Sequence, residues 1–297
     1  MNDLLTKCNL CPRHCNINRH ETVGFCKATD TLKIARADLH FFEEPCISGD
    51  KGSGTIFFTY CNLKCVFCQN YEISSDNIGK EISIERFSEI CLNLQNKGAL
   101  NINLVTPTHY IPLIKEGLKL AKLKGLTIPI VYNTSSYETT DSLKLLDGLI
   151  DIYLPDFKYY NDDIAIKYSS APNYVNVCKD AIAEMYRQVG KPVFDEDGIM
   201  KKGVIVRHLL LPNMEDDSKK IIEYLYNTYK DNIYMSIMNQ YTPMKKLKYE
   251  ELNHTINDDI YDDVINFAYD LGVRNAFIQE GETQKKSFIP DFKNQEF

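Results

Sequence analysis

The sequence has no apolar stretch that approaches the ~20 residues needed to cross a membrane as a helix. Its first ten residues, MNDLLTKCNL, also lack the charged-then-apolar layout of a secretory signal peptide. No internal repeat or low-complexity segment is evident along the 297 residues. We therefore expect a cytoplasmic protein with no membrane partner.

A surplus of positive charge is also missing. Asp and Glu total 41 against 34 Lys and Arg, which gives a formal net charge of -7. The basic clusters at 245–248 and 285–286 are short, whereas nucleic-acid-binding domains usually present a basic patch or stripe. We interpret these lysines as solvated surface and expect no nucleic-acid partner. The 44% hydrophobic share suffices for one large domain, with or without a small appendage.

Cysteine, by contrast, is abundant and unevenly distributed. Eight of the ten cysteines lie within the first 68 residues. Disulfides are rare in the cytoplasm, where clustered cysteines more often hold metal. Residues 1–50 hold five of these cysteines and no long periodic segment. We therefore predict a small Cys-rich metal-binding segment over 1–50 and a larger domain over 51–297.

Beyond residue 52, short apolar runs alternate with helix-like segments. The strand candidates are 55–59, 101–105, 128–132, 149–154, 203–211, 233–238 and 276–279. The helix candidates lie around 84–94, 113–123, 143–146, 175–189, 221–229 and 267–271, with Asp216 to Ser218 as predicted caps of the helix at 221–229. This alternation is typical of parallel βα units in a sheet covered on both faces. We predict an α/β fold, a full or partial barrel of about six units.

Polar segments follow the strand candidates at the ends where such barrels carry their chemistry. They are Cys61–Cys68, Thr106–Tyr110, Asn133–Glu138, Pro155–Tyr159, Arg207 with His208, and Asn239–Pro243. We therefore expect these groups to converge on one site.

The segment CNLKCVFCQN places Cys61, Cys65 and Cys68 in a C-x3-C-x2-C spacing on one loop. Soft thiolates select iron–sulfur clusters or zinc. A [4Fe-4S] cluster usually takes four cysteine ligands, so three thiolates leave one iron open to another molecule. By spacing alone, a zinc ion completed by a distant side chain is an alternative. The candidates for that fourth ligand are His40, His109 and His208.

The same segment resembles the cluster-binding loop of radical S-adenosylmethionine (SAM) enzymes, including the aromatic Phe67 before the third cysteine. The segments CVFCQN, VIVRHLLLPN and DIYLPDFKY resemble pyruvate formate-lyase activating enzymes, and EEPCISG, NLVTPTHY and CNLCPRHC are similar to homologues of that group. The resemblance covers nearly the whole chain. It implies a partial (β/α)6 TIM-like barrel of the radical SAM type.

The resemblance also implies a set of cofactors and a reaction. Cys61, Cys65 and Cys68 would hold a [4Fe-4S] cluster, and the amine and carboxylate of SAM would chelate its open iron. A reductant such as flavodoxin or ferredoxin would supply an electron that cleaves SAM to a 5′-deoxyadenosyl radical, which abstracts a hydrogen atom from the substrate. The barrel would orient the reactants and exclude water.

Other SAM-binding residues are carried over from the family by position. Phe67 would lie near the adenine, and Arg207 would contact the SAM carboxylate, for which a guanidinium is well suited. Asp156 and Lys158 match the family's Asp-x-Lys after the fourth strand. Thr134 matches a threonine in the loop after the third strand.

Three positions depart from the family pattern. Thr106-Pro107-Thr108 replaces the Gly-Gly-Glu that meets the SAM amine in many relatives, so Thr106 and Thr108 would take over this contact. Asn133 stands where the activating enzymes have an Asp that helps to bind a monovalent cation near SAM, which leaves that cation site open. Tyr241 stands near the position of a histidine. These changes suggest that SAM is kept while the substrate differs.

The N-terminal cysteines Cys8, Cys11, Cys15 and Cys26 have the spacing C-x2-C-x3-C-x10-C. Four thiols in a segment without its own core suit a structural zinc ion. A second [4Fe-4S] cluster that relays electrons is the alternative. Cys46 is left open between a further ligand, a reactive thiol and a packed side chain.

Two classes of function follow from these observations. The first is a radical SAM enzyme whose favoured role is to activate a glycyl radical enzyme. Within this class, modification of another protein, a peptide or a small molecule is the alternative. The second is a non-catalytic zinc or iron–sulfur protein that binds a partner or transfers electrons. Four residues are expected to be structural, Cys91 and Cys178 in the core and His109 and His208 as hydrogen-bonded groups.

Overall fold

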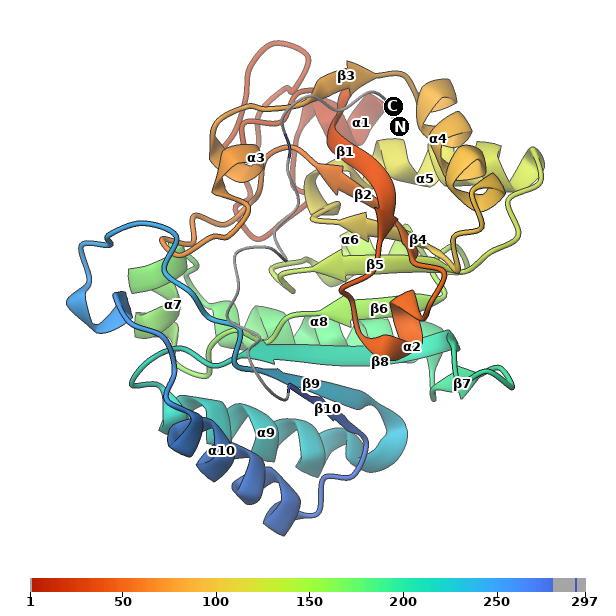
Figure 1. The fold of residues 1–297 in the computed structure, drawn as a ribbon. Coiled ribbons are helices and arrows are strands. Elements are labelled where there is room, and N and C mark those ends of the chain that lie inside the picture. Colours follow the sequence, from red (N-terminus) through yellow and green to blue (C-terminus); the bar gives the residue numbers. More distant parts are fainter. Residues whose placement is uncertain (1, 280–291, 293–297) are drawn as a thin grey trace.

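The computed structural model describes residues 2–279 and 292 of the chain (Figure 1). Its centre is a ten-stranded sheet in the order β10-β9-β8-β6-β5-β4-β2-β1-β3, with β7 beside β8. All pairings from β2 to β10 along this order are parallel. The strands are β1 (Leu32–His40), β2 (Ser53–Phe58), β3 (Lys80–Ile82), β4 (Ile102–Val105), β5 (Ile130–Thr134), β6 (Ile152–Pro155), β7 (Val193–Phe194), β8 (Met200–Leu209), β9 (Tyr234–Met238) and β10 (Ala276–Ile278).

Helices connect the parallel strands and pack around the sheet (Figure 1). They are α4 (Ile84–Asn96), α5 (Ile111–Leu123), α8 (Tyr174–Val189), α9 (Glu215–Tyr229) and α10 (Asp258–Leu271), with the shorter α1 (Asn2–Thr6), α2 (Pro45–Ser48), α3 (Tyr71–Ser75), α6 (Thr140–Lys144) and α7 (Asp162–Ser169). The predicted α/β partial barrel is therefore confirmed. Among the described residues, no helix has the length and apolar character that a membrane crossing requires.

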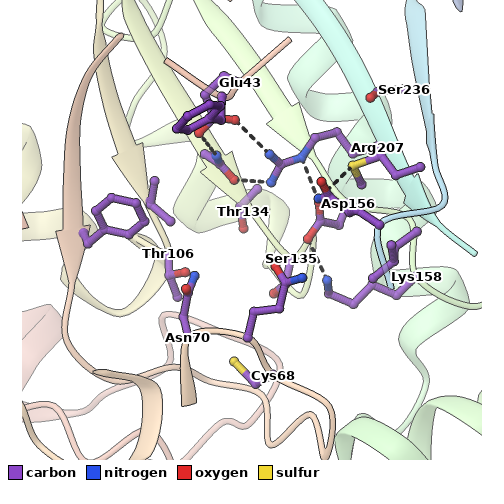
Figure 2. A pocket seen from close by; sticks show the side chains of 18 of the residues that line it. Glu43, Cys68, Asn70, Thr106, Thr134, Ser135, Asp156, Lys158, Arg207 and Ser236 are labelled. Carbon is purple, nitrogen blue, oxygen red and sulfur yellow. Dashed lines mark hydrogen bonds and ion pairs between the residues drawn. The ribbon is translucent and has the colours of Figure 1, made fainter. Parts of the chain in front are cut away.

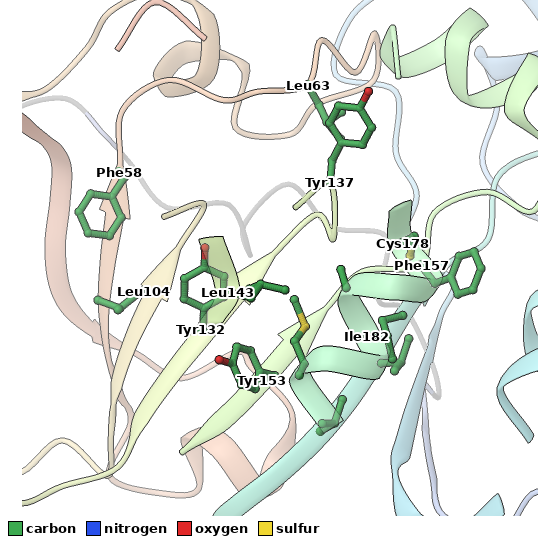
Figure 3. Close-up of a cluster of buried hydrophobic side chains, with 14 of the residues drawn as sticks. Phe58, Leu63, Leu104, Tyr132, Tyr137, Leu143, Tyr153, Phe157, Cys178 and Ile182 are labelled. Atoms are coloured by element: carbon green, nitrogen blue, oxygen red, sulfur yellow. The ribbon is translucent and has the colours of Figure 1, made fainter. Parts of the chain in front are cut away.

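The core lies between the sheet and its helices. Strands β2, β4, β5 and β6 are buried along their whole length, as expected for a sheet covered on both faces. Figure 3 shows Tyr132 and Tyr153 from neighbouring strands beside Leu143, with Cys178 and Ile182 on α8. Cys178 and Cys91 are fully buried on apolar helix faces, which confirms their prediction as core residues.

The first 50 residues contain a strand that the sequence analysis missed. Strand β1 pairs antiparallel with β2 from Ile34 to His40 and with β3 from Leu32 to Ile34. Its core-facing residues, among them Leu32 and Ile34, are almost fully buried. Part of the segment 1–50 thus continues the sheet of the larger domain, while a division near residue 50 stays a prediction.

The predicted cap of α9 is wrong. The helix begins at Glu215, so Asp216 to Ser218 lie in its first turn, and its N-cap Met214 makes no side-chain cap hydrogen bond. The side chains of Asp217 and Ser218 are used elsewhere, because Asp217 accepts a hydrogen bond from the backbone of Tyr160 and Ser218 contacts His208.

Candidate functional site

A cavity of about 560 Å³ lies at the carboxyl ends of the parallel strands. Figure 2 shows Cys68 on one side of it and Glu43 on the opposite side. Most of the predicted site residues line this cavity, which places them in one site. They are Cys61, Cys65, Phe67, Cys68, Thr106, Asn133, Thr134, Asp156, Lys158 and Arg207.

The loop that carries the three cysteines follows β2 and is fixed to the end of α7. The backbone N–H of Lys64 donates to the carbonyl of Ser169 at 3.1 Å, and that of Val66 donates to the carbonyl of Tyr168 at 2.8 Å. The Ser169 hydroxyl also donates to the sulfur of Cys65 at 2.9 Å. The helix end therefore sets the position of the middle cysteine.

Two of the three thiols, those of Cys61 and Cys68, lie in surroundings that disfavour a free thiolate. Burial, with a contribution from the neighbouring Cys65, raises the pKa of Cys61 to about 12. Burial also raises the pKa of Cys68. A bound metal replaces the thiol proton and compensates the buried negative charge. The backbone N–H of Leu63 points at the sulfur of Cys61 at 3.4 Å, the kind of hydrogen bond that tunes an iron–sulfur cluster.

Across the cavity, four charged side chains form a chain of alternating sign, here called the charge cluster: Lys158, Asp156, Arg207 and Glu43. The Lys158 ammonium lies 2.6 Å from Asp156 Oδ2, and Arg207 Nε donates to Asp156 Oδ1 at 3.0 Å. Burial alone would raise the pKa of Asp156, but Lys158 and Arg207 outweigh it and lower this pKa below its ordinary value. Asp156 is therefore a carboxylate at neutral pH.

Glu43 completes the charge cluster from an unexpected part of the chain, the loop between β1 and α2. Its Oε2 accepts from Arg207 Nη1 at 3.2 Å, and its Oε1 accepts from the amide of Asn103 at 2.9 Å. Arg207 also donates to the side-chain oxygen of Asn133. The sequence analysis assigned no role to Glu43, although two adjacent acids between an apolar pair and a proline are a visible signal.

The three candidate threonines differ in whether they line the cavity. Thr106 and Thr134 line the cavity, whereas Thr108 is not among its lining residues. Thr108 and Thr134 both donate to Glu138 Oε1, at 2.6 and 2.5 Å, and the Tyr132 hydroxyl donates to the same oxygen at 3.2 Å. Glu138, to which the sequence analysis gave no role, thus ties the ends of β4 and β5 together.

Two predicted histidines are structural. His109 Nε2 contacts the carbonyl of Thr59 at 2.8 Å, and His208 contacts the carbonyl of Phe157 and the hydroxyl of Ser218, both at 2.8 Å. Burial lowers the pKa of His109 to about 3 and that of His208 to about 4, so both are neutral at pH 7. Their prediction as hydrogen-bonded groups is confirmed.

Two aromatic residues support one wall of the cavity. Phe67 meets the ring of Tyr241 edge-on, with ring centroids 5.9 Å apart. The Tyr241 hydroxyl donates to the carbonyl of Leu252 at 2.7 Å, and the side chain is almost fully buried. Tyr241 therefore supports the ring of Phe67 by this edge-on contact.

The N-terminal cysteines Cys8, Cys11, Cys15 and Cys26 line a second, much smaller cavity together with His109. The segment is joined to the barrel by Arg19, which is buried and donates to the carbonyl of His109. The four thiols thus meet in one place despite their spread over 19 residues of sequence.

No group of three or more His, Cys, Asp or Glu side chains in the described part of the chain is arranged to hold a single metal ion. A [4Fe-4S] cluster does not require such a group, because each thiolate binds a different iron. A zinc ion does require it, because four sulfurs must lie about 2.3 Å from one metal. The donor set Cys61, Cys65 and Cys68, three thiolates on one loop, suits a cluster.

The fold and the site define a class of protein that a family model identifies. The model of the radical SAM superfamily matches residues 55–225, more than half of the chain. The chain belongs to the radical SAM superfamily. Membership implies a [4Fe-4S] cluster and SAM, with SAM cleavage as the shared chemistry.

The chain is also similar to individual proteins. The chain is 30% identical to an uncharacterised protein of Methanocaldococcus jannaschii over 277 residues, 90% of this chain and 75% of that protein. It is 22% identical to the pyruvate formate-lyase-activating enzyme of Staphylococcus epidermidis over 201 residues, 64% of this chain and 74% of that enzyme.

Among solved structures, Streptococcus suis SuiB bound to S-adenosylmethionine has a TM-score of 0.51 at 12% identity. The match covers 75% of this chain and 48% of SuiB, so the chain spans about half the length of that protein. At this identity, the likeness shows the fold alone.

Proposed function

We propose that this radical SAM protein is an enzyme whose [4Fe-4S] cluster is held by Cys61, Cys65 and Cys68. The observation that carries the proposal is that these thiols share one cavity with the charge cluster at the strand ends. When bound, the cluster and SAM supply one-electron reductive cleavage and a radical able to abstract a hydrogen atom. Every other part of the reaction depends on how the chain's own residues hold the reactants.

Different residues of the cavity contact different parts of SAM in this proposal. Phe67, fixed by Tyr241, offers an aromatic face for the adenine. Thr106 and Thr134 line the cavity and supply polar groups for the methionyl part, whereas Thr108 is not among the lining residues. A carboxylate ligand would have to replace a present partner of Arg207, and Glu43 at 3.2 Å makes the longer of its two ion pairs.

The charge cluster also bears on the monovalent cation that the resemblance left open. Asp156 is already paired with Lys158 and Arg207, and the Asn133 oxygen accepts from Arg207. We propose that these two cationic side chains take the place of the metal cation in this chain.

The proposal is tested by anaerobic reconstitution with iron and sulfide, reduction, and measurement of 5′-deoxyadenosine. We expect SAM-dependent product from the wild type and none from Cys65→Ala, which also loses bound iron. Cys91 is a buried cysteine of α4 away from the cavity. The Cys91→Ala variant is therefore the control and should retain both 5′-deoxyadenosine formation and bound iron. Equal product from wild type and Cys65→Ala would reject the cluster assignment, and no product from the reconstituted wild type would favour a non-catalytic metal protein.

For the substrate, we propose activation of a glycyl radical enzyme, supported by the likeness to the Staphylococcus epidermidis activating enzyme. The test is the electron paramagnetic resonance signal of a glycyl radical after incubation with candidate enzymes, SAM and a reductant such as flavodoxin or ferredoxin. Failure with every candidate, combined with active SAM cleavage, would assign the chain to another protein, peptide or small-molecule substrate.

We also propose that Cys8, Cys11, Cys15 and Cys26 bind a second metal group, zinc or [4Fe-4S]. The support is their shared cavity and the lack of a disulfide among them in the structure. Metal analysis of Cys11→Ser decides between the two, since loss of about one zinc or about four irons per chain distinguishes them. Unchanged metal content would reject the second site.

A further inference from the structure

The loop between β1 and α2 contributes two adjacent acids, Glu43 and Glu44, to the lining of the cavity. Figure 2 shows Glu43 on the side opposite Cys68. Both are strongly buried, since the Glu43 side chain is 9% exposed and Glu44 is 8% exposed. Two buried carboxylates side by side are costly unless each meets positive charge or hydrogen-bond donors.

The partners of the two acids are unequal. Glu43 accepts from Arg207 and Asn103, so both of its oxygens are used. Glu44 lies near the hydroxyl of Ser236, and its Oε2 is buried without a hydrogen-bond partner among the described residues. An orphaned carboxylate oxygen of this kind destabilises the folded chain, and a donor brought by a ligand would remove that penalty.

The charge balance around these acids is also incomplete. The cavity wall holds three carboxylates, Glu43, Glu44 and Asp156, against two cationic groups, Lys158 and Arg207. Burial raises the pKa of both glutamates in spite of Arg207, so keeping both as carboxylates requires positive charge beyond that of Arg207. One further positive charge would balance the wall.

We propose that the wall formed by Glu43 and Glu44 binds a protonated nitrogen of the substrate, an ammonium or guanidinium group, with Glu44 as the principal acceptor. The inference rests on the proposed radical SAM function and adds a substrate class to it. A neutral donor would satisfy Oε2 but leave the charge unbalanced, and an anion would be repelled. The position of Glu43 opposite Cys68 leaves the thiol side of the cavity to the cluster.

The cationic nitrogen has two sources, a small amine or a basic side chain of a peptide, and the test separates them. The reconstituted wild-type protein with SAM is titrated anaerobically by calorimetry with n-butylammonium, 1-butanol, butyrate and a blocked Gly-Lys-Gly tripeptide. We expect a cationic probe to bind at least about tenfold more tightly than 1-butanol, with no binding of butyrate. Binding of the tripeptide alone points to a peptide substrate, and binding of n-butylammonium points to a free amine.

Variants test whether the tighter binding of cationic probes depends on Glu44 and Glu43. Glu44→Gln should remove the preference for the cationic probe, and Glu43→Gln should reduce it less, because Glu43 is already paired with Arg207. Glu89→Gln, an exposed carboxylate of α4, is the control and should retain it. Both cavity variants keep the side-chain shape, and their melting temperatures report whether the fold is intact.

The inference is overturned if 1-butanol binds as tightly as the cationic probes, or if folded Glu44→Gln retains their preference. A Glu44→Gln variant that loses SAM binding while it still prefers the cation would assign the carboxylate to SAM instead. Failure of the proposed function is a separate result, because it appears as absent 5′-deoxyadenosine in the wild type whatever the probes do.

Discussion

At the scale of single residues, the cavity wall depends on charges that are nearly all paired inside the protein. Arg207, whose side chain is 16% exposed, joins Asp156 and Glu43, two carboxylates supplied by segments far apart in the sequence. A buried ion pair contributes little net stability as a whole, but its rupture leaves an uncompensated buried charge. Arg207 is therefore a stability residue as well as a candidate SAM ligand.

We predict that Arg207→Met lowers the free energy of unfolding by about 3–5 kcal/mol, because it leaves Asp156 and Glu43 without their shared partner. Urea unfolding of the metal-free protein measures this. Arg187→Met is the matched control, since Arg187 is 53% exposed and water screens its ion pairs with Asp147 and Glu184, so its loss should be much smaller. Equal losses in the two variants would contradict the argument.

A second prediction concerns Glu138, whose pKa is raised by burial although three hydroxyls donate to it. A carboxyl with a raised folded pKa contributes stability that is complete below its ordinary value of 4.5 and is lost as pH rises through the folded value. Glu138→Gln removes this titration. The stability of the variant relative to wild type should therefore increase as pH rises from about 4.5 to 8, as measured by urea unfolding.

The same unfolding measurements can contradict this prediction for Glu138. If the difference in unfolding free energy between Glu138→Gln and wild type is flat between these pH values, Glu138 does not titrate differently in the folded chain. A difference that falls with pH would reverse the sign and show that the hydroxyls of Thr108, Thr134 and Tyr132 stabilise the charged form more than burial opposes it.

Residues that belong to a local motif could be predicted from the sequence, and residues that act through distant contacts could not. Cys61, Cys65 and Cys68 share one loop, and all three line the cavity. Glu43 meets Arg207 across 164 positions of sequence, a contact that no local spacing encodes. Thr108 was carried over as a SAM ligand by position alone, and its hydroxyl is taken by Glu138 instead.

At the scale of elements, the close contact between α4 and α5 depends on a glycine. A Cβ added to Gly117 would lie 2.3 Å from the ring of Phe87, which is fully buried. Gly117→Ala gains about 1 kcal/mol of helix propensity, but overpacking costs about 1–3 kcal/mol. We predict a net loss in thermal stability, measured on the metal-free protein.

The contact with Phe87 is tested by a double-mutant cycle. In a Phe87→Leu background the smaller side chain leaves room for the added methyl group, so Gly117→Ala should be less damaging there than in the wild type. A melting temperature that rises with Gly117→Ala alone would show that the start of α4, which carries Phe87, can shift at little cost in stability.

Element prediction succeeded where burial on both faces leaves a continuous apolar run, as in β4 and β5. It failed for β1, whose alternating residues stand in a Cys-rich segment that was expected to lack a core of its own. That strand is held by its pairing with β2 and β3. The cap of α9 was missed for a related reason, because Asp217 and Ser218 bond to other elements.

At the scale of the whole molecule, the Cys-rich segment and the barrel are joined by more than one chain crossing. Strand β1 adds to the sheet, and Arg13 Nε donates to the carbonyl of Asn62 at 2.9 Å, next to Cys61. Arg19 reaches the carbonyl of His109 at the end of β4. We therefore expect changes in the N-terminal segment to disturb the loop that carries the three cysteines.

The last prediction separates the cysteine segment from the strand that follows it. A chain of residues 51–297 lacks β1 and exposes the edge of β2, a strand buried along its whole length, so we expect it to aggregate or to lose its cooperative unfolding. A chain of residues 28–297 retains β1 while lacking Cys8 to Cys26, and should keep the circular dichroism spectrum of the full chain. Equal thermal transitions for the two fragments would mean that β1 is dispensable and that the barrel folds independently from residue 51. Failure of both would mean that the cysteine segment is part of the folding unit, because its contacts with His109 and Asn62 are then required for the barrel to form.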